Sequence, residues 1–196
     1  MIDEALIRSH GAIDLMLGRR DEGWRRLDTS ADGFWNSFLA IPITAPALLV
    51  IFLSYARLLV EAGIEMSVGG IVSILALIGV VNWLASVLVI VLLARPLGVG
   101  HRTSHLVVAV NWASVAIAYA RAVPASLTLL VGNGPTLATL MVVIEVVTLV
   151  LYWRVLSAAS EASPLVPTVM FVVTITLGYA LTVAMQTSLG LSPPTL

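Results

Sequence analysis

The residue with the clearest chemical potential is Glu145, which interrupts the apolar run 137–153, a segment long enough to cross a membrane. An ionisable side chain in such a place needs a partner or a function. Ala138, Glu145, Thr148 and Tyr152 follow one another at spacings of 7, 3 and 4 residues. They therefore share one face of a helix, and we expect this face to point into a bundle.

Arg121, in the preceding apolar segment, is the natural partner of Glu145. If one helix ends near residue 131 and the next begins near residue 137, both charges lie about 12–15 Å from the same end at a rise of about 1.5 Å per residue. An unpaired charge at the centre of a span costs about 2.5–3.5 kcal/mol on insertion scales. The first hypothesis is therefore a structural Arg121–Glu145 ion pair.

Asn82 and Asn111 are the polar residues that would support such a pair by donating hydrogen bonds. Two alternatives stay open. In one, Glu145 is a proton- or cation-responsive carboxylate that lines a path with the two asparagines. In the other, Pro124 ends its helix early, which places Arg121 at the outer interface and leaves Glu145 neutral or facing a partner.

The sequence offers little support for catalysis or metal binding. It contains no cysteine, which excludes disulfides, thiolate zinc sites and cysteine nucleophiles. His101 and His105 are four residues apart, but no third ligand of matching type is nearby, so solvated loop histidines are expected. No Ser/His or paired-Asp constellation occurs in the apolar segments. We therefore expect no enzyme activity, no metal and no cofactor.

Composition indicates a protein built for lipid. The 196 residues are 59 % hydrophobic and 11 % charged, with a mean hydropathy of +1.03, whereas a soluble domain is about 25 % charged. The net charge is −1 and the ten basic residues, all arginine, are scattered along the chain. This pattern gives no reason to expect nucleic acid as a partner, and the lipid bilayer is the first expected partner.

Five segments reach the length of about 20 residues that a helix needs to cross the hydrocarbon core. They are residues 38–60, 71–94, 105–131, 137–157 and 165–189. The breaks between them are short, which favours sequential antiparallel neighbours. The predicted fold is thus all-α: a polytopic integral membrane protein with five transmembrane helices in one bundle. Residues 31–196 form the membrane domain and residues 1–30 a cytoplasmic segment.

The arginines predict the orientation, because basic loops stay on the cytoplasmic side. Only Arg57 and Arg121 fall at or towards the other side. This arrangement places the N-terminus in the cytoplasm and the uncharged tail 189–196 outside. The eight arginines that define the cytoplasmic side are Arg8, Arg19, Arg20, Arg25, Arg26, Arg95, Arg102 and Arg154.

The N-terminal segment 2–18 has the pattern of an amphipathic interfacial helix. Its apolar residues recur near helical spacing, and its polar residues take the other side; the two sets are Ile2, Leu6, Ile13, Met16, Leu17 and Asp3, Glu4, Arg8, His10, Asp14. An equally weighted alternative is that the segment packs under the bundle. Trp24, Phe34 and Trp35 suit the lipid–water boundary and are the expected interfacial anchors.

Small residues form two stripes at the spacing that lets helix backbones approach closely. Either stripe can meet another span or a partner protein. The stripes are Ala109, Ala113, Ala116, Ala120 in the third segment and Thr174, Gly178, Thr182, Gln186 in the fifth.

Two motifs carry a resemblance to known proteins. SADGFWNSFLA at residues 30–40 and VAVNWASV at residues 108–115 resemble an uncharacterised family of small bacterial inner-membrane proteins, which are loosely grouped with the five-span Yip-domain family. The resemblance implies an accessory or membrane-organising role in the bacterial inner membrane, with a periplasmic C-terminus. No partner and no site residue are carried over.

The functional expectation is a non-enzymatic inner-membrane accessory protein, which is a subunit of a larger membrane complex or a homo-oligomer. The alternative is a small transporter or channel that uses Glu145, Asn82 and Asn111, with Pro42 and Pro46 permitting movement.

Overall fold

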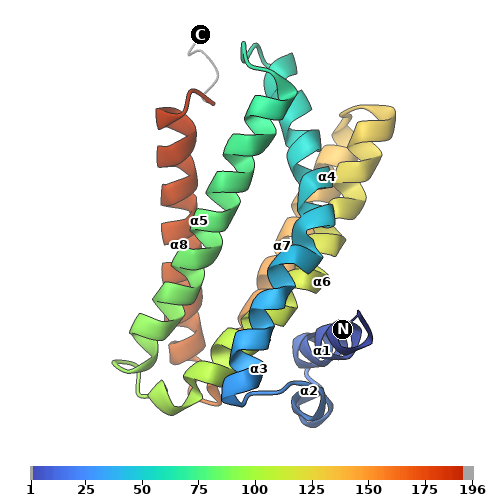
Figure 1. Cartoon of the computed structure of the whole chain (residues 1–196). Helices are drawn as coiled ribbons and strands as arrows, with labels where there is room; N and C mark the ends of the chain where they lie inside the picture. The colour runs from blue at the N-terminus through green and yellow to red at the C-terminus, as the bar shows by residue number, and fades with distance from the viewer. Residues whose placement is uncertain (1, 192–196) are drawn as a thin grey trace.

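The computed structural model describes residues 2–191, which form an all-helical bundle (Figure 1). Five helical segments are long and apolar enough to cross a membrane, which confirms the five predicted segments. The helices of these segments are α3 (Ala31–Asn36), η1 (Ser37–Leu39) and α4 (Ala40–Glu61), then α5 (Val68–Ala94), η2 (Gly100–Arg102) with α6 (Thr103–Val131), α7 (Pro135–Ser160) and α8 (Leu165–Ser188).

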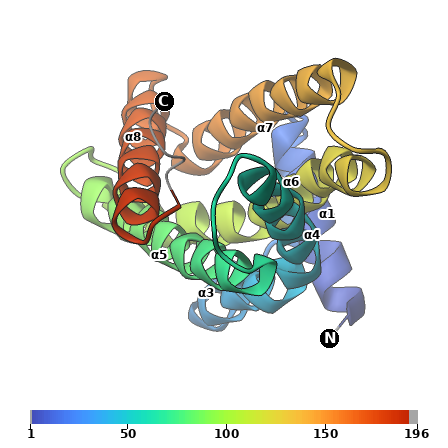
Figure 2. The same cartoon turned by 90° about the horizontal axis from the view of Figure 1, so that it is seen from above.

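The long helices run between two ends of the molecule. We call the end with α1 (Ile2–Met16), α2 (Arg20–Arg26) and the α5–α6 and α7–α8 connections the lower end, and the opposite one the upper end. α6 packs against α4, α7 and α1, whereas α5 packs mainly against α8. Figure 2, viewed from above, shows α5 and α8 on one side of the molecule and α4, α6 and α7 on the other.

Local sequence explains where the helices start and stop. The Ser67 hydroxyl accepts a hydrogen bond from the Gly70 N–H at 3.1 Å and caps the start of α5. Pro135 opens α7, where its missing N–H costs nothing. Gly132 ends α6 with φ +83°, a conformation that favours glycine.

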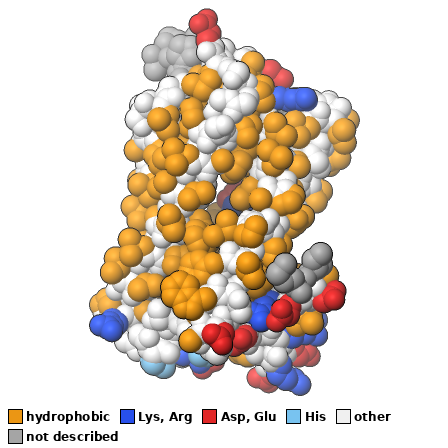
Figure 3. All heavy atoms as spheres, in the orientation of Figure 1, with side chains coloured by type: hydrophobic (Ala, Val, Ile, Leu, Met, Phe, Trp, Pro, Cys, Tyr) orange, Lys and Arg blue, Asp and Glu red, His pale blue; other side chains and the backbone are white. Residues whose placement is uncertain are grey.

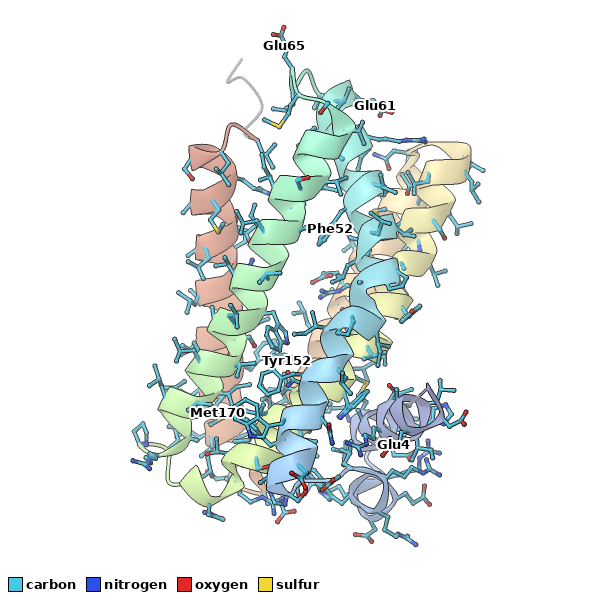
Figure 4. The ribbon with its side chains drawn as sticks, in the orientation of Figure 1. Glu4, Phe52, Glu61, Glu65, Tyr152 and Met170 are labelled. Atoms are coloured by element: carbon cyan, nitrogen blue, oxygen red, sulfur yellow. The ribbon has the colours of Figure 1, made fainter. Side chains whose placement is uncertain are left out.

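The larger apolar core lies in the lower half. Its fully buried members include Trp112 and Leu106 from α6, Leu156 from α7 and Met170 from α8. A smaller cluster in the upper half joins the end of α4 to the start of α5 and includes Leu59, Ile71 and Leu75. In Figure 4, Met170 and Tyr152 lie in the lower part of the bundle, while Phe52 lies higher, on α4.

The N-terminal segment packs under the bundle, since α1 contacts α6 and α7. Asp14, expected on the polar outer side, is only 2 % exposed, so that expectation is wrong. The physical reason is neutralisation by two guanidinium groups: Arg19 pairs with Asp14 at 2.7 Å, and Arg26 pairs with its other oxygen. Leu6 and Leu17, expected on the apolar face, are largely exposed.

Gly11 allows α1 and α2 to approach each other. A Cβ on Gly11 would lie 2.9 Å from the Cβ of Arg26 and 3.0 Å from the carbonyl oxygen of Gly23. Only a glycine fits such a contact without a shift of α2. A glycine inside a helix is ordinarily destabilising, but Gly11 has a packing role here.

Candidate functional site

The structure brings Arg121 of α6 and Glu145 of α7 together. Arg121 Nη2 donates a hydrogen bond to Glu145 Oε1 at 2.7 Å. Thr148 holds the guanidinium in place, because its Oγ1 accepts from Arg121 Nε at 3.2 Å and donates to the main-chain carbonyl of Glu145 at 2.9 Å. Glu145 and Thr148 thus act on Arg121 from the shared helix face that the sequence predicts.

The alternative in which Pro124 ends the third long helix is wrong. α6 continues through Pro124 to Val131, and Pro124 is buried. A proline removes one backbone hydrogen bond, but the contacts of α6 with α4 and α7 keep the helix intact around it. Arg121 consequently lies about 15 Å from the upper end of α6 rather than at that end.

Neither asparagine contacts the ion pair, which corrects the expectation that one of them donates to it. Asn82 Nδ2 donates to Thr182 Oγ1 at 2.8 Å and links α5 to α8. Asn111 Nδ2 donates to Ser37 Oγ at 2.9 Å. Asn111 is fully buried in the lower core, about 15 Å below Arg121 along α6. Asn111 lines neither of the two cavities described below, and the path with Glu145 and the two asparagines stays a prediction.

The ion pair borders a cavity of about 220 Å³ between α4, α6 and α7. The side chain of Arg121 is 37 % exposed and that of Glu145 is 50 % exposed. Their apolar neighbours in the cavity wall include Ile51, Leu58 and Ile144. Figure 3 shows a hollow at mid-height between α5 and α4, with charged atoms at its base. The pair is thus an open one rather than a buried clamp.

A second cavity of about 150 Å³ lies nearer the upper end. It shares Ser54 and Leu58 with the first cavity. Arg57 and Glu61 line it, and Arg57 Nη1 donates to the carbonyl of Leu129 at 3.3 Å. We call the two neighbouring cavities together the vestibule; one borders the ion pair and the other lies near the upper end of α4.

Ser54 lies where the two cavities meet. The residue is 2 % exposed, and its hydroxyl has no hydrogen-bond partner among the described residues. A buried hydroxyl without a partner is costly, which makes it a candidate contact for a ligand or a water molecule. Ser54 is not among the site residues predicted from the sequence. Ser54, Arg57 and Glu61 are nevertheless spaced by 3 and 4 residues and so share a polar face of α4.

The expected interfacial anchors have different environments at the lower end. Trp24 packs edge-on against His105, with ring centres 5.2 Å apart. Phe34 packs edge-on against Trp35 at 5.3 Å, and Trp35 itself is 71 % exposed. His105 is half-buried within α6, so the expectation of a solvated loop histidine is wrong at that position.

Both small-residue stripes are used inside the chain. Ala109 and Ala113 are fully buried within the lower core. Gly178 faces Asn82 closely enough that an added Cβ would lie 3.5 Å from its side-chain oxygen. The close approach that these residues permit is therefore an approach between helices of one chain.

Comparison with protein-family models, with curated proteins and with solved structures finds no match for the chain. Within residues 2–191, no group of three His, Asp or Glu side chains is placed to hold a metal ion. The vestibule, with its ion pair and the unpartnered Ser54 hydroxyl, is the candidate site on which a function can be proposed.

Proposed function

We propose that this chain is a five-span integral membrane protein of the bacterial inner membrane, with its lower end in the cytoplasm. The five long apolar helices support insertion. The arginines support the orientation, because Arg8, Arg19, Arg20, Arg25 and Arg26 belong to the segment of α1 and α2 at the lower end. The C-terminal tail would then be periplasmic; its residues 192–196 lie outside the described part of the chain.

The N-terminal segment is proposed to touch the lipid headgroups as well as the bundle. Leu6, Ile7 and Leu17 are exposed although they are large and apolar, and so is Trp35. Side chains of this kind at the end of a membrane bundle gain by lying at the lipid boundary. The interfacial role expected from the sequence therefore rests on these exposed residues rather than on the whole of α1.

The proposed activity is non-enzymatic: the vestibule admits a small water-soluble solute from the periplasmic side to Arg121 and Glu145, as in a small transporter. The observation that carries this proposal is the partly exposed ion pair at one cavity, with a second cavity between it and the upper end. A charge exposed to acyl chains at that depth would be costly, whereas water or a polar solute solvates it.

Below the ion pair the way is closed by the lower core. Trp112, Leu106 and Met170 are buried there, and Phe38 packs edge-on against Trp83 with ring centres 5.4 Å apart. A site at mid-depth that opens to one side and is closed to the other fits the alternating access of transporters. Pro46, inside α4, is the proposed place for movement in the vestibule wall.

The accessory-subunit role loses part of its support. The two small-residue stripes, which could meet either another span or a partner protein, make contacts within the chain. The exposed apolar faces of α7 and α8 suit lipid as well as a partner. Assembly with itself or with another membrane protein therefore stays a prediction, and so does the resemblance to the Yip-domain family.

The absence of cysteine allows a direct test with two serine-to-cysteine variants. Ser54→Cys places a thiol in the vestibule, and Ser37→Cys places one in the closed lower core as the matched control. In intact right-side-out vesicles, a membrane-impermeant charged thiol reagent is expected to modify the Ser54→Cys variant and to spare the Ser37→Cys variant.

Three results would contradict the proposal. No modification of the Ser54→Cys variant, or equal rates for the two variants, would mean that the vestibule does not admit water. Protection in native membranes that disappears after purification in detergent would instead indicate that a partner covers the vestibule, which would favour the accessory role.

A further inference from the structure

We infer that the vestibule binds a small zwitterion with an apolar side group, the chemical class of an aliphatic α-amino acid. This inference rests on the proposed function, because the ligand must enter through a vestibule that is open to water. The residues that line the cavity determine this class of solute.

The ion pair leaves hydrogen-bonding groups of both signs free. A guanidinium has five N–H donors; Arg121 uses one for Glu145 and one for Thr148 among the described residues. The second carboxylate oxygen of Glu145 accepts no hydrogen bond there. A ligand carboxylate can therefore bind the remaining N–H groups while a ligand ammonium binds the free oxygen, without separation of the pair.

The net charge of the site argues against a ligand with a single charge. Arg121 and Glu145 cancel each other, so a simple anion meets the repulsion of the carboxylate and a simple cation that of the guanidinium. The upper cavity repeats this composition, since it also contains one arginine and one glutamate, Arg57 and Glu61. A solute that carries both a positive and a negative charge finds an oppositely charged side chain for each of them in both cavities of the vestibule.

The remaining contacts set the size and the polarity of the ligand. Ser54 supplies an unpartnered hydroxyl, 2 % exposed, that can donate to the ligand carboxylate or accept from its ammonium. Ile51, Met141 and Ile144 supply apolar wall in a cavity of about 220 Å³. Such a cavity suits a compact apolar side chain next to the two charged groups.

The test measures binding to the purified full-length chain in nanodiscs by calorimetry, with leucine as the probe. Two analogues each remove one charge: 4-methylpentanoate lacks the ammonium, and 3-methylbutylamine lacks the carboxylate. Leucine is expected to bind saturably, and each analogue at least about tenfold more weakly, because a charge-assisted hydrogen bond is lost.

Ser54→Ala separates a ligand contact from a structural role. The variant is expected to bind leucine about three- to tenfold more weakly. Its melting temperature should be unchanged or higher, because an unpartnered buried hydroxyl is removed. Ser73→Ala is the matched control, since Ser73 is exposed on α5 and donates to the carbonyl of Gly69 at 2.9 Å. It should change neither property.

Absence of leucine binding, or equal binding of leucine and either analogue, would overturn the zwitterion inference. A lower melting temperature of the Ser54→Ala variant with unchanged binding would overturn the role of Ser54 as a ligand contact. These failures are distinguishable from failure of the proposed function: modification of the Ser54→Cys variant without leucine binding refutes only the solute class, whereas no modification refutes the open vestibule itself.

Discussion

The lower and upper halves of the bundle are built from similarly apolar helices but are packed in opposite ways. In the lower half, α6 inserts Leu106 and Trp112 into a closely packed apolar core. Asn111 Nδ2 donates to Ser37 in that core, while Asn111 Oδ1 and Trp112 Nε1 are buried without a partner among the described residues. In the upper half the same helix borders two cavities and an open ion pair.

The two halves therefore contribute differently to stability and to the proposed function. Tight packing brings many weak contacts and leaves no room for a ligand. Cavities lose such contacts, so they are retained where something else is gained. We therefore assign the lower half mainly to holding the fold and the upper half to binding.

The largest expected effect comes from shortening a leucine in each half. Leu156 is fully buried in the lower core, whereas Leu58 lines both cavities. Leu156→Ala should lower the free energy of unfolding by about 2–5 kcal/mol, because it opens a void in a packed core. Leu58→Ala should cost clearly less, since its side chain already borders empty space. Reversible unfolding in mixed detergent micelles measures both values. Equal losses of unfolding free energy in the two variants would contradict the proposed difference in packing between the halves.

A smaller effect is expected from adding a methyl group to a glycine at each end. A Cβ on Gly33 would lie 2.1 Å from the carbonyl oxygen of Asp28, whereas a Cβ on Gly69 would meet nothing within 4 Å. Gly33→Ala should cost about 1–3 kcal/mol through overpacking. Gly69→Ala should be neutral or stabilise by up to about 1 kcal/mol, because alanine favours the helix. Melting temperatures in detergent measure the two effects. A tolerated Gly33→Ala would mean that the turn before α3 adapts easily.

Much of the fold was predictable because length and apolar composition indicate which segments form helices that could cross a membrane. The bounds near residues 94, 131 and 165 agree closely with the helix ends at Ala94, Val131 and Leu165. The sequence also predicted that Arg121 and Glu145 lie at the same depth in the bundle. That prediction needs only the rise per residue of a helix and one short connection between the two helices.

The openness of the site was not predictable, because it depends on how the helices pack and not on their composition. Nothing in the local sequence distinguishes Asn111, which is buried against Ser37, from a residue that lines a path. Ser54 is one serine in an apolar run, and its importance follows only from the cavity around it. Asp14 was wrongly predicted to lie on the exposed face of α1. Its partners Arg19 and Arg26 lie outside α1, in the turn before α2 and in α2 itself, so the pattern of α1 alone does not reveal them.

The smallest expected effect, and the sharpest test of the contrast, is the coupling between Arg121 and Glu145. A double-mutant cycle compares Arg121→Gln, Glu145→Gln and the combined variant by their free energies of unfolding. Because both side chains are more than a third exposed, the coupling should be about 0.2–1 kcal/mol and should weaken as salt is added. A buried pair would behave differently, because removal of one partner leaves a charge without compensation and costs about 3–5 kcal/mol. In that case Glu145→Gln alone would destabilise the protein more than the combined change does. Such a result would mean that the ion pair is buried and that the upper half is as tightly packed as the lower half. The vestibule would then not be open to water.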